Sequence, residues 1–213
     1  ISNPLLWFIQ HALGNITRTP SISEITWRAW EEGYKVVNKL FADAIAESLE
    51  GVERPIIILP QDYHLYMLPH YLRQQVGDRV QIQPFIHIPW PGPDAWRILP
   101  QQMRNALLSS LLESDRVGFQ TQKDAFNFVQ TSRFYLEGAH SHGRRDGIEY
   151  GGRDVDAIAY PISIDVEKVR ELAEESVTQL EKNQLMSFVG DRATILRVDG
   201  IEPSGPQPRD ALS

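Results

Sequence analysis

The sequence predicts an α/β protein with a Rossmann-like, doubly wound parallel sheet. Two observations point to this fold. Short apolar runs typical of buried strands, such as residues 56–59 and 80–86, alternate with stretches whose apolar residues recur every three or four positions, as on one face of a helix. Strands that alternate with helices favour a parallel sheet, because parallel neighbours must be joined by a crossover that covers the sheet.

The first half of the chain supplies a helix, a strand, a second helix and a second strand. Ser23, with Thr26 after it, marks the start region of the first helix. Residues 56–59 follow a proline as a continuous apolar run, which predicts a strand buried on both faces. A helical stretch over 65–72 and a strand over 80–86 come next. The apolar stripe of the first helix is Trp30, Tyr34, Val37, Phe41 and Ile45.

The second half repeats this alternation after a proline-rich loop. Residues 89–93 contain three prolines, too many for a helix or a strand, so we expect a shaped loop directly after the second strand. The later elements are a helix over 103–111, a strand over 117–119, a helix over 125–135, strands over 148–150 and 155–160, a helix over 166–180 and a strand over 194–198. The order of strand and helix therefore extends over most of the chain.

The chain divides into one large lobe and a short remainder. We expect residues 1–190 to form one incomplete Rossmann-like lobe, and 191–199 to begin the strand or linker of a second lobe. We expect 200–213 to be a divergent, disordered tail, because residues 202–208 include three prolines and one glycine and supply nothing for a core. The chain opens on an apolar helical run rather than on Met, so we expect a sequence cut short at both ends.

Composition excludes several classes of protein. Of the 213 residues, 42% are hydrophobic, which is enough for a core and argues against disorder throughout. The net charge of −7 argues against a dedicated binder of nucleic acid or of anionic membranes. Because the chain has no cysteine, disulfides, thiolate nucleophiles and cysteine-based zinc sites are excluded. Neither a membrane span nor a signal peptide is visible in the sequence, so we expect a cytoplasmic protein.

The most informative polar residues follow the two strands of the first half. In open α/β sheets, ligands bind outside the carboxyl ends of the strands. Asp62 follows the first strand and His87 the second, so a carboxylate and an imidazole on adjacent strand ends could bind sugar hydroxyls or handle a proton. The alternative is that Asp62 only caps the next helix and His87 is a packed, hydrogen-bonded histidine.

Other candidate motifs are weaker. His140 and His142 lack a carboxylate or cysteine at a matching interval, so we assign no metal site. The composition of their segment is that of a flexible loop. Tryptophans are most often core residues, but Trp7 and Trp90 lie near chain or loop ends, where an aromatic face could stack on a sugar ring. G-x-G-x-x-G, P-loop and G-x-S-x-G motifs are absent, so dinucleotide binding, NTPases and α/β-hydrolases have no support.

Six motifs, in their order and approximate intervals up to Val198, resemble the trehalose-6-phosphate synthase family of retaining glycosyltransferases. They are Asn3-Pro4-Leu5-Leu6-Trp7; Trp30-x-x-x-Tyr34-x-x-x-Asn38-x-x-Phe41-Ala42; Asp62-Tyr63-His64-Leu65; His87-Ile88-Pro89-Trp90-Pro91 with Arg97-Ile98-Leu99-Pro100; Gly118-Phe119-Gln120-Thr121; and Tyr160-Pro161-Ile162-Ser163-Ile164-Asp165. The resemblance implies a GT-B architecture of two Rossmann-like lobes, of which this chain would be most of the first, acceptor-side lobe.

The resemblance also implies roles for three residues. The positions of Trp7 and Asp62 line the acceptor pocket in that family, and the position of His87, the expected catalytic residue, lies beside the transferred glucosyl unit. We therefore expect these three side chains to converge on one side of the sheet. The implied substrates are a nucleotide sugar such as UDP-glucose and a sugar phosphate such as glucose 6-phosphate, with no cofactor and no metal. No nucleic-acid or membrane partner is implied, and a homo-oligomer stays open.

Departures from the family pattern bear on activity. Gly200 and Gly205 stand where the family has the Arg and Lys that hold the donor diphosphate, Gln61 stands in place of His, and Ser163 in place of the usual Gly. The family's glycine-rich donor loop lies before the segment that matches this chain. We therefore expect the isolated chain to be inactive. The alternatives are a non-catalytic fragment or sugar-phosphate-binding lobe, a glucosylglycerol-phosphate synthase, or a pseudo-glycosyltransferase.

Overall fold

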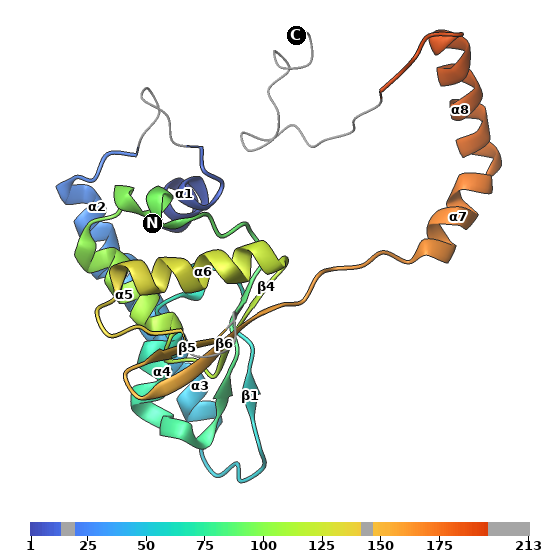
Figure 1. Cartoon of the computed structure of the whole chain (residues 1–213). Coiled ribbons are helices and arrows are strands. Elements are labelled where there is room, and N and C mark those ends of the chain that lie inside the picture. The colour runs from blue at the N-terminus through green and yellow to red at the C-terminus, as the bar shows by residue number, and fades with distance from the viewer. Residues whose placement is uncertain (14–19, 142–146, 196–213) are drawn as a thin grey trace. The chain divides into compact units, whose positions relative to one another are not determined.

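The structure, a computed structural model, describes residues 1–13, 20–141 and 147–195. The chain packs as two compact units, Ile1–Pro161 and Ile162–Ser213. The first unit contains the sheet, and the described part of the second contains two helices (Figure 1). Each unit is described by itself below, and the expectation of one lobe over 1–190 stays a prediction.

Within the described residues, the strands of the first unit form a two-stranded parallel sheet and a four-stranded sheet that is parallel except at one strand. Strand β1 pairs with β2, β3 with β4 and β4 with β6, all in parallel, whereas β5 pairs with β6 in antiparallel fashion. This arrangement confirms the predicted Rossmann-like α/β lobe. The strands are β1 (Ile57–Ile58), β2 (Gln81–Ile82), β3 (Phe85–Ile86), β4 (Arg116–Phe119), β5 (Gly147–Tyr150) and β6 (Arg153–Ala159).

The later α-helices of this unit connect strands as crossovers, whereas the earlier ones precede the first strand. Thr121 begins one of the crossover helices by accepting a hydrogen bond from the backbone of Asp124, as an N-cap threonine does. The α-helices of this unit are α1 (Phe8–Gln10), α2 (Glu24–Arg28), α3 (Lys35–Ser48), α4 (Leu68–Val76), α5 (Gln101–Leu111) and α6 (Gln122–Tyr135). Short π-helical turns span Ser2–Trp7 and Ala29–Tyr34, and 3₁₀ turns span Tyr63–Leu65, Gly77–Arg79 and Pro93–Ile98.

The predicted strand over 80–86 is two strands, β2 and β3. Pro84 separates them, because a proline has no backbone N–H to donate to a ladder. The two strands pair with different neighbours, β2 with β1 and β3 with β4. The Gln83 N–H still donates to the Ile58 carbonyl at 2.8 Å, so the backbone continues as one extended segment between its neighbours.

The strand over 56–59 is not buried on both faces, as the sequence predicted. Ile58 packs into an apolar cluster with Leu68 and Leu72 of α4. Ile57 and Leu59, which point to the opposite face, are 59% and 57% exposed. The prediction was wrong because the apolar run contains no information about which face of the sheet the crossover helices cover.

The helix that precedes β1 also turns a different face inward. Trp30 and Tyr34 are buried as predicted, but the buried residues one and two turns later are Asn38 and Ala42. Val37 and Phe41, which belonged to the predicted stripe, are 47% and 51% exposed. The spacing of four residues from Trp30 to Ala42 follows one side of the helix, and the polar Asn38 falls on that side.

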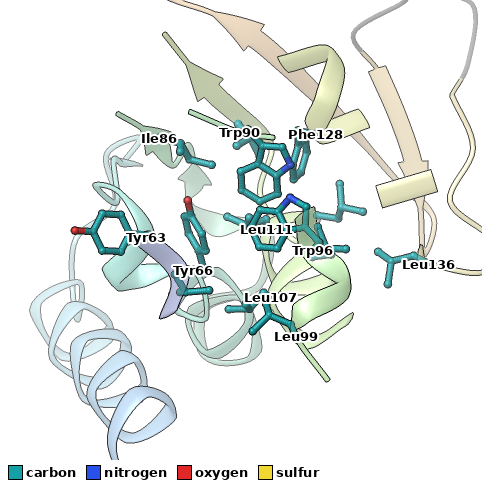
Figure 2. Close-up of a cluster of buried hydrophobic side chains, with 14 of the residues drawn as sticks. Tyr63, Tyr66, Ile86, Trp90, Trp96, Leu99, Leu107, Leu111, Phe128 and Leu136 are labelled. Atoms are coloured by element: carbon teal, nitrogen blue, oxygen red, sulfur yellow. The ribbon is translucent and has the colours of Figure 1, made fainter. Parts of the chain in front are cut away.

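The proline-rich loop is folded into the core. Trp90 and Trp96 are fully buried, and their rings stack at a centroid distance of 4.4 Å. Figure 2 shows the two rings side by side. The Trp90 ring also meets Phe128 of α6 edge-on at 5.1 Å. The expectation that Trp90 offers its face to a sugar is therefore wrong, because that face is covered by protein.

The second unit is helical where it is described. The predicted helix over 166–180 is two helices, α7 (Val166–Glu174) and α8 (Ser176–Val189), because Glu175 has extended backbone angles. Thr194 and Ile195 belong to no strand, and the rest of the predicted strand, with the predicted tail, lies outside the described residues. Within the described ranges, no helix of either unit combines the length and the apolar character needed to cross a bilayer.

The stacked tryptophans provide a test of the core. Replacing Trp96 by Ala should lower the free energy of unfolding by about 3–5 kcal/mol, because the change leaves a large cavity beneath Trp90. Phe134→Ala is the matched control, since that side chain is 60% exposed and its loss should cost about 0.5 kcal/mol or less. Urea unfolding followed by circular dichroism measures both, and equal effects would contradict this description of the core.

Candidate functional site

Asp62 and His87 meet at the carboxyl ends of β1 and β3. Beyond β1 the parallel pairing continues, because the Asp62 N–H donates to the Phe85 carbonyl at 2.8 Å. The His87 N–H in turn donates to Asp62 Oδ1 at 3.3 Å. The predicted convergence of these two residues at one end of the sheet is therefore confirmed.

Asp62 does not act as a helix cap. It precedes the 3₁₀ turn Tyr63–Leu65, yet its carboxylate accepts no hydrogen bond from that turn. Its backbone angles, φ 64° and ψ −176°, belong to a region that is essentially restricted to glycine and costs about 1–3 kcal/mol. Strain of this kind persists only where the surroundings impose it, and here it turns the carboxylate towards His87 rather than towards its own turn.

His87 is an exposed histidine whose ring has contacts on two sides. Its ring lies edge-on to Phe85 at a centroid distance of 4.8 Å, and its Nε2 lies 2.8 Å from Gln61 Oε1. The ring is therefore packed and hydrogen-bonded, as the alternative supposed, but the residue is exposed at the strand end and stays open to a ligand.

A buried tyrosine holds the turn that follows Asp62. The Tyr34 hydroxyl donates to the Tyr63 carbonyl at 2.6 Å and accepts from the Tyr66 N–H at 3.2 Å. Burial raises the pKa of Tyr34 well above its ordinary value, so the hydroxyl keeps its proton and can donate. The turn is thereby attached to the helical segment that contains Tyr34.

Asn38 completes this attachment, a role that its place in the sequence motif did not predict. Its Nδ2 donates to the His64 carbonyl at 3.0 Å, and its Oδ1 accepts from the Met67 N–H at 3.0 Å. The available signal was a polar residue four positions after Tyr34 on an apolar stripe. Because such a residue is buried only with partners, it points to a polar contact inside the fold.

Trp7 ends a π-helical turn near the site, and among the described residues no ring contact or hydrogen bond joins its side chain to Asp62 or His87. Its half-buried ring lies 4.2 Å from the ring of His11. The π-helical turn that ends at Trp7 contacts the turn after Asp62, where Tyr63 donates to Asn3 Oδ1 at 2.9 Å. The segment is therefore brought to the site, and the role of the Trp7 ring stays a prediction.

Other hollows and polar groups lie apart from this pair. An apolar pocket of about 480 Å³ includes His64 but not Trp7, Asp62 or His87. The backbone of His140 pairs with that of Glu149, and His142 lies outside the described residues. Within the described residues, no three histidine, aspartate or glutamate side chains are grouped so that they could hold a metal ion.

A Rossmann-like lobe in which an aspartate and a histidine meet at the strand ends is typical of the ligand-binding half of an open α/β protein. Residues 1–204 match Glycosyltransferase family 20, and the chain belongs to this family. The resemblance noted in the sequence is thereby confirmed, together with the fold it implied.

Curated relatives support the same family. The chain is 37% identical over 190 residues to "Alpha,alpha-trehalose-phosphate synthase [UDP-forming]" of Botryotinia fuckeliana. The aligned region covers 85% of this chain and 33% of that protein. The chain is 30% identical over 203 residues to "Probable alpha,alpha-trehalose-phosphate synthase [UDP-forming] 2" of Arabidopsis thaliana, covering 94% of this chain and 23% of that protein. The chain thus spans a third or less of these relatives.

Solved structures share the lobe. One structure, described as "Trehalose-6-phosphate from E. coli bound with UDP-2-fluoro glucose", is 27% identical in sequence and has a TM-score of 0.67. The superposed region covers 89% of this chain and 38% of the chain in that structure. The N-terminal domain of Candida albicans trehalose-6-phosphate phosphatase is also 27% identical, with a TM-score of 0.61, and covers 86% of this chain and 36% of its own. The GT-B origin of the lobe follows from these likenesses.

The strained backbone of Asp62 gives a test that does not depend on activity. Asp62→Gly and Asp62→Ala both remove the carboxylate, but only alanine stays strained at this φ, so the glycine variant should be the more stable by about 1 kcal/mol. At Gln81, an exposed position in β2, the order should be reversed by about 0.5–1 kcal/mol. Urea denaturation of the four variants gives the comparison, and the same order at both sites would show that Asp62 is unstrained.

Proposed function

We propose that this chain is the acceptor-side lobe of a retaining glycosyltransferase of the trehalose-6-phosphate synthase type. Such an enzyme transfers glucose from a nucleotide sugar, such as UDP-glucose, to a sugar phosphate, such as glucose 6-phosphate. The observation behind the proposal is the direct contact between Asp62 and His87 at adjacent strand ends. Family membership and relatives described as UDP-forming support it.

Each of the three residues has a chemical task in this proposal. The Asp62 carboxylate uses one oxygen for the His87 N–H, and its Oδ2, which has no recorded partner among the described residues, accepts hydrogen bonds from sugar hydroxyls. The half-buried Trp7 ring offers an apolar face to the pyranose. His87 is the proposed catalytic residue and lies beside the glucosyl unit that is transferred.

The transfer itself replaces one bond at the anomeric carbon by another on the same face. The bond from this carbon to the diphosphate oxygen breaks, and a bond to the acceptor hydroxyl forms. We propose that the hydroxyl proton passes to the leaving diphosphate oxygen, so that no protein base is required. The lobe then contributes chiefly by holding the acceptor at contact distance, which is a large part of the rate gain in a two-substrate reaction.

The isolated chain is proposed to be inactive. Concentrated diphosphate charge needs cations, and the two positions where the family has them, Gly200 and Gly205, are glycines in a segment outside the described residues. One lobe also supplies only one wall of a two-lobe site. We further propose that the protein acts in the cytoplasm without a bound cofactor or metal, and self-association stays an open prediction.

A second candidate is a lobe that binds a sugar phosphate without transferring glucose. The likeness to the N-terminal domain of a trehalose-6-phosphate phosphatase favours it, because that protein's stated activity is not glucosyl transfer. Within the transferase class, glucosylglycerol-phosphate synthases and pseudo-glycosyltransferases are alternatives that differ in the acceptor.

The experiment tests transfer in the longest reading frame that contains this chain. UDP-, ADP- and GDP-glucose are each combined with glucose 6-phosphate or glycerol 3-phosphate, and products are identified by mass spectrometry. Asp62→Asn should lower kcat/KM about 10–100-fold, because a neutral amide oxygen accepts weaker hydrogen bonds from the sugar hydroxyls than the charged carboxylate does. Lys39→Ala, on the exposed side of α3, is the control and should leave kcat/KM unchanged.

Three results would oppose the proposal. Absence of product in every combination would leave the binding lobe as the function. Full activity in Asp62→Asn would remove Asp62 from the site. Transfer by the purified 213-residue chain would contradict the expectation that one lobe is insufficient.

A further inference from the structure

The side chain of Gln61 has no role in the proposed function, yet it contacts the ring of His87. Gln61 precedes Asp62 at the end of β1, and its Oε1 lies 2.8 Å from His87 Nε2. Both residues are exposed at the carboxyl ends of the strands. The contact therefore lies at the edge of the candidate site, where a substrate would also approach.

A second hydrogen bond determines which atom of the Gln61 amide faces His87. Gln61 Nε2 lies 2.9 Å from the Leu59 carbonyl oxygen. A carbonyl oxygen can only accept, so the amide nitrogen must point to Leu59 and the amide oxygen to His87. Because Oε1 also only accepts, the proton of this second contact must be on His87 Nε2.

We propose that Gln61 is a positioning residue that holds neutral His87 in its Nε2–H tautomer. The edge-on contact with Phe85 restrains the same ring from another side, and the hydrogen bond from the His87 backbone N–H to Asp62 holds its main chain. Nδ1 then carries the lone pair, and it has no recorded hydrogen bond among the described residues. The tautomer follows from the hydrogen bonds of Gln61 alone; only the identity of the bound ligand rests on the proposed function.

The consequence for recognition is specific. A neutral His87 with Nε2–H engaged by Gln61 offers an acceptor at Nδ1, so it recognises an O–H donor such as a sugar hydroxyl. It donates through Nδ1 only after gaining a second proton. Gln61 thereby selects a hydroxyl, rather than a phosphate oxygen, as the ligand group at this nitrogen.

His70 provides a contrast within the same chain. Its Nδ1 lies 2.6 Å from Glu113 Oε1, and its Nε2 lies 3.0 Å from Gln74 Nε2. The carboxylate can only accept, so Nδ1 carries the proton and Nε2 faces the Gln74 amide nitrogen. A glutamine thus contacts a histidine Nε2 at both sites, with opposite proton positions, which makes Gln74 a matched control for Gln61.

The test uses long-range ¹H–¹⁵N spectra of the ¹⁵N-labelled 213-residue chain at about pH 8.5, where an ordinary histidine with a pKa of about 6.5 is neutral. Wild-type His87 should show a protonated Nε2 and an unprotonated Nδ1. Gln61→Leu should move the two nitrogen shifts towards each other as both tautomers become populated. Gln61→Glu, which keeps an acceptor, should restore the wild-type pattern, and Gln74→Leu should leave His87 unchanged.

Identical His87 spectra in wild type and Gln61→Leu would overturn the inference. Kinetics of the longer protein separate this outcome from the proposed function. If no glucosyl transfer occurs but Gln61 sets the tautomer, the proposed function fails and the inference stands. If transfer occurs, Gln61→Leu should lower kcat/KM severalfold with rescue by Gln61→Glu, and unchanged kinetics would remove Gln61 from a positioning role.

Discussion

The parallel backbone pairing beyond β1 is the constraint on which the candidate site depends. The Phe85 N–H donates to the Pro60 carbonyl at 2.9 Å, and the Asp62 N–H donates to the Phe85 carbonyl at 2.8 Å. This register pairs Gln61 with Phe85, so Asp62 and His87 follow directly after the paired residues of the two segments. A slip of one residue would send the carboxylate to the other face of the sheet, because side chains alternate between faces.

Strain at Asp62 is balanced by the polar groups beneath its turn. An unfavourable φ costs about 1–3 kcal/mol. Tyr34 and Asn38 together make four hydrogen bonds to the backbone of the following turn, each worth about 0.5–1.5 kcal/mol. The sum of about 2–6 kcal/mol is sufficient to hold the strained residue, so two buried polar side chains of one helical segment determine where a carboxylate of a different segment points.

The loop after His87 is held by aromatic packing instead. The Trp90 N–H donates to Asp124 Oδ1 at 2.8 Å, and its ring lies between Trp96 and Phe128. Figure 2 shows these rings at the centre of the buried cluster. His87 is thus followed within three residues by a fully buried anchor, so one side of the site is rigid through apolar contact and the other through hydrogen bonds.

The class of fold and the pair of candidate site residues could be predicted from the sequence. Alternating strand and helix patterns predict a parallel sheet, and position directly after a strand placed Asp62 and His87 at its carboxyl end. Three features became visible only in the folded chain: Trp90 is core, Asn38 takes the place of Val37 on the inner face of its helix, and Gln61 contacts the His87 ring. They could not be predicted because periodicity is a local property, whereas burial and hydrogen-bond partners depend on segments far apart in the chain.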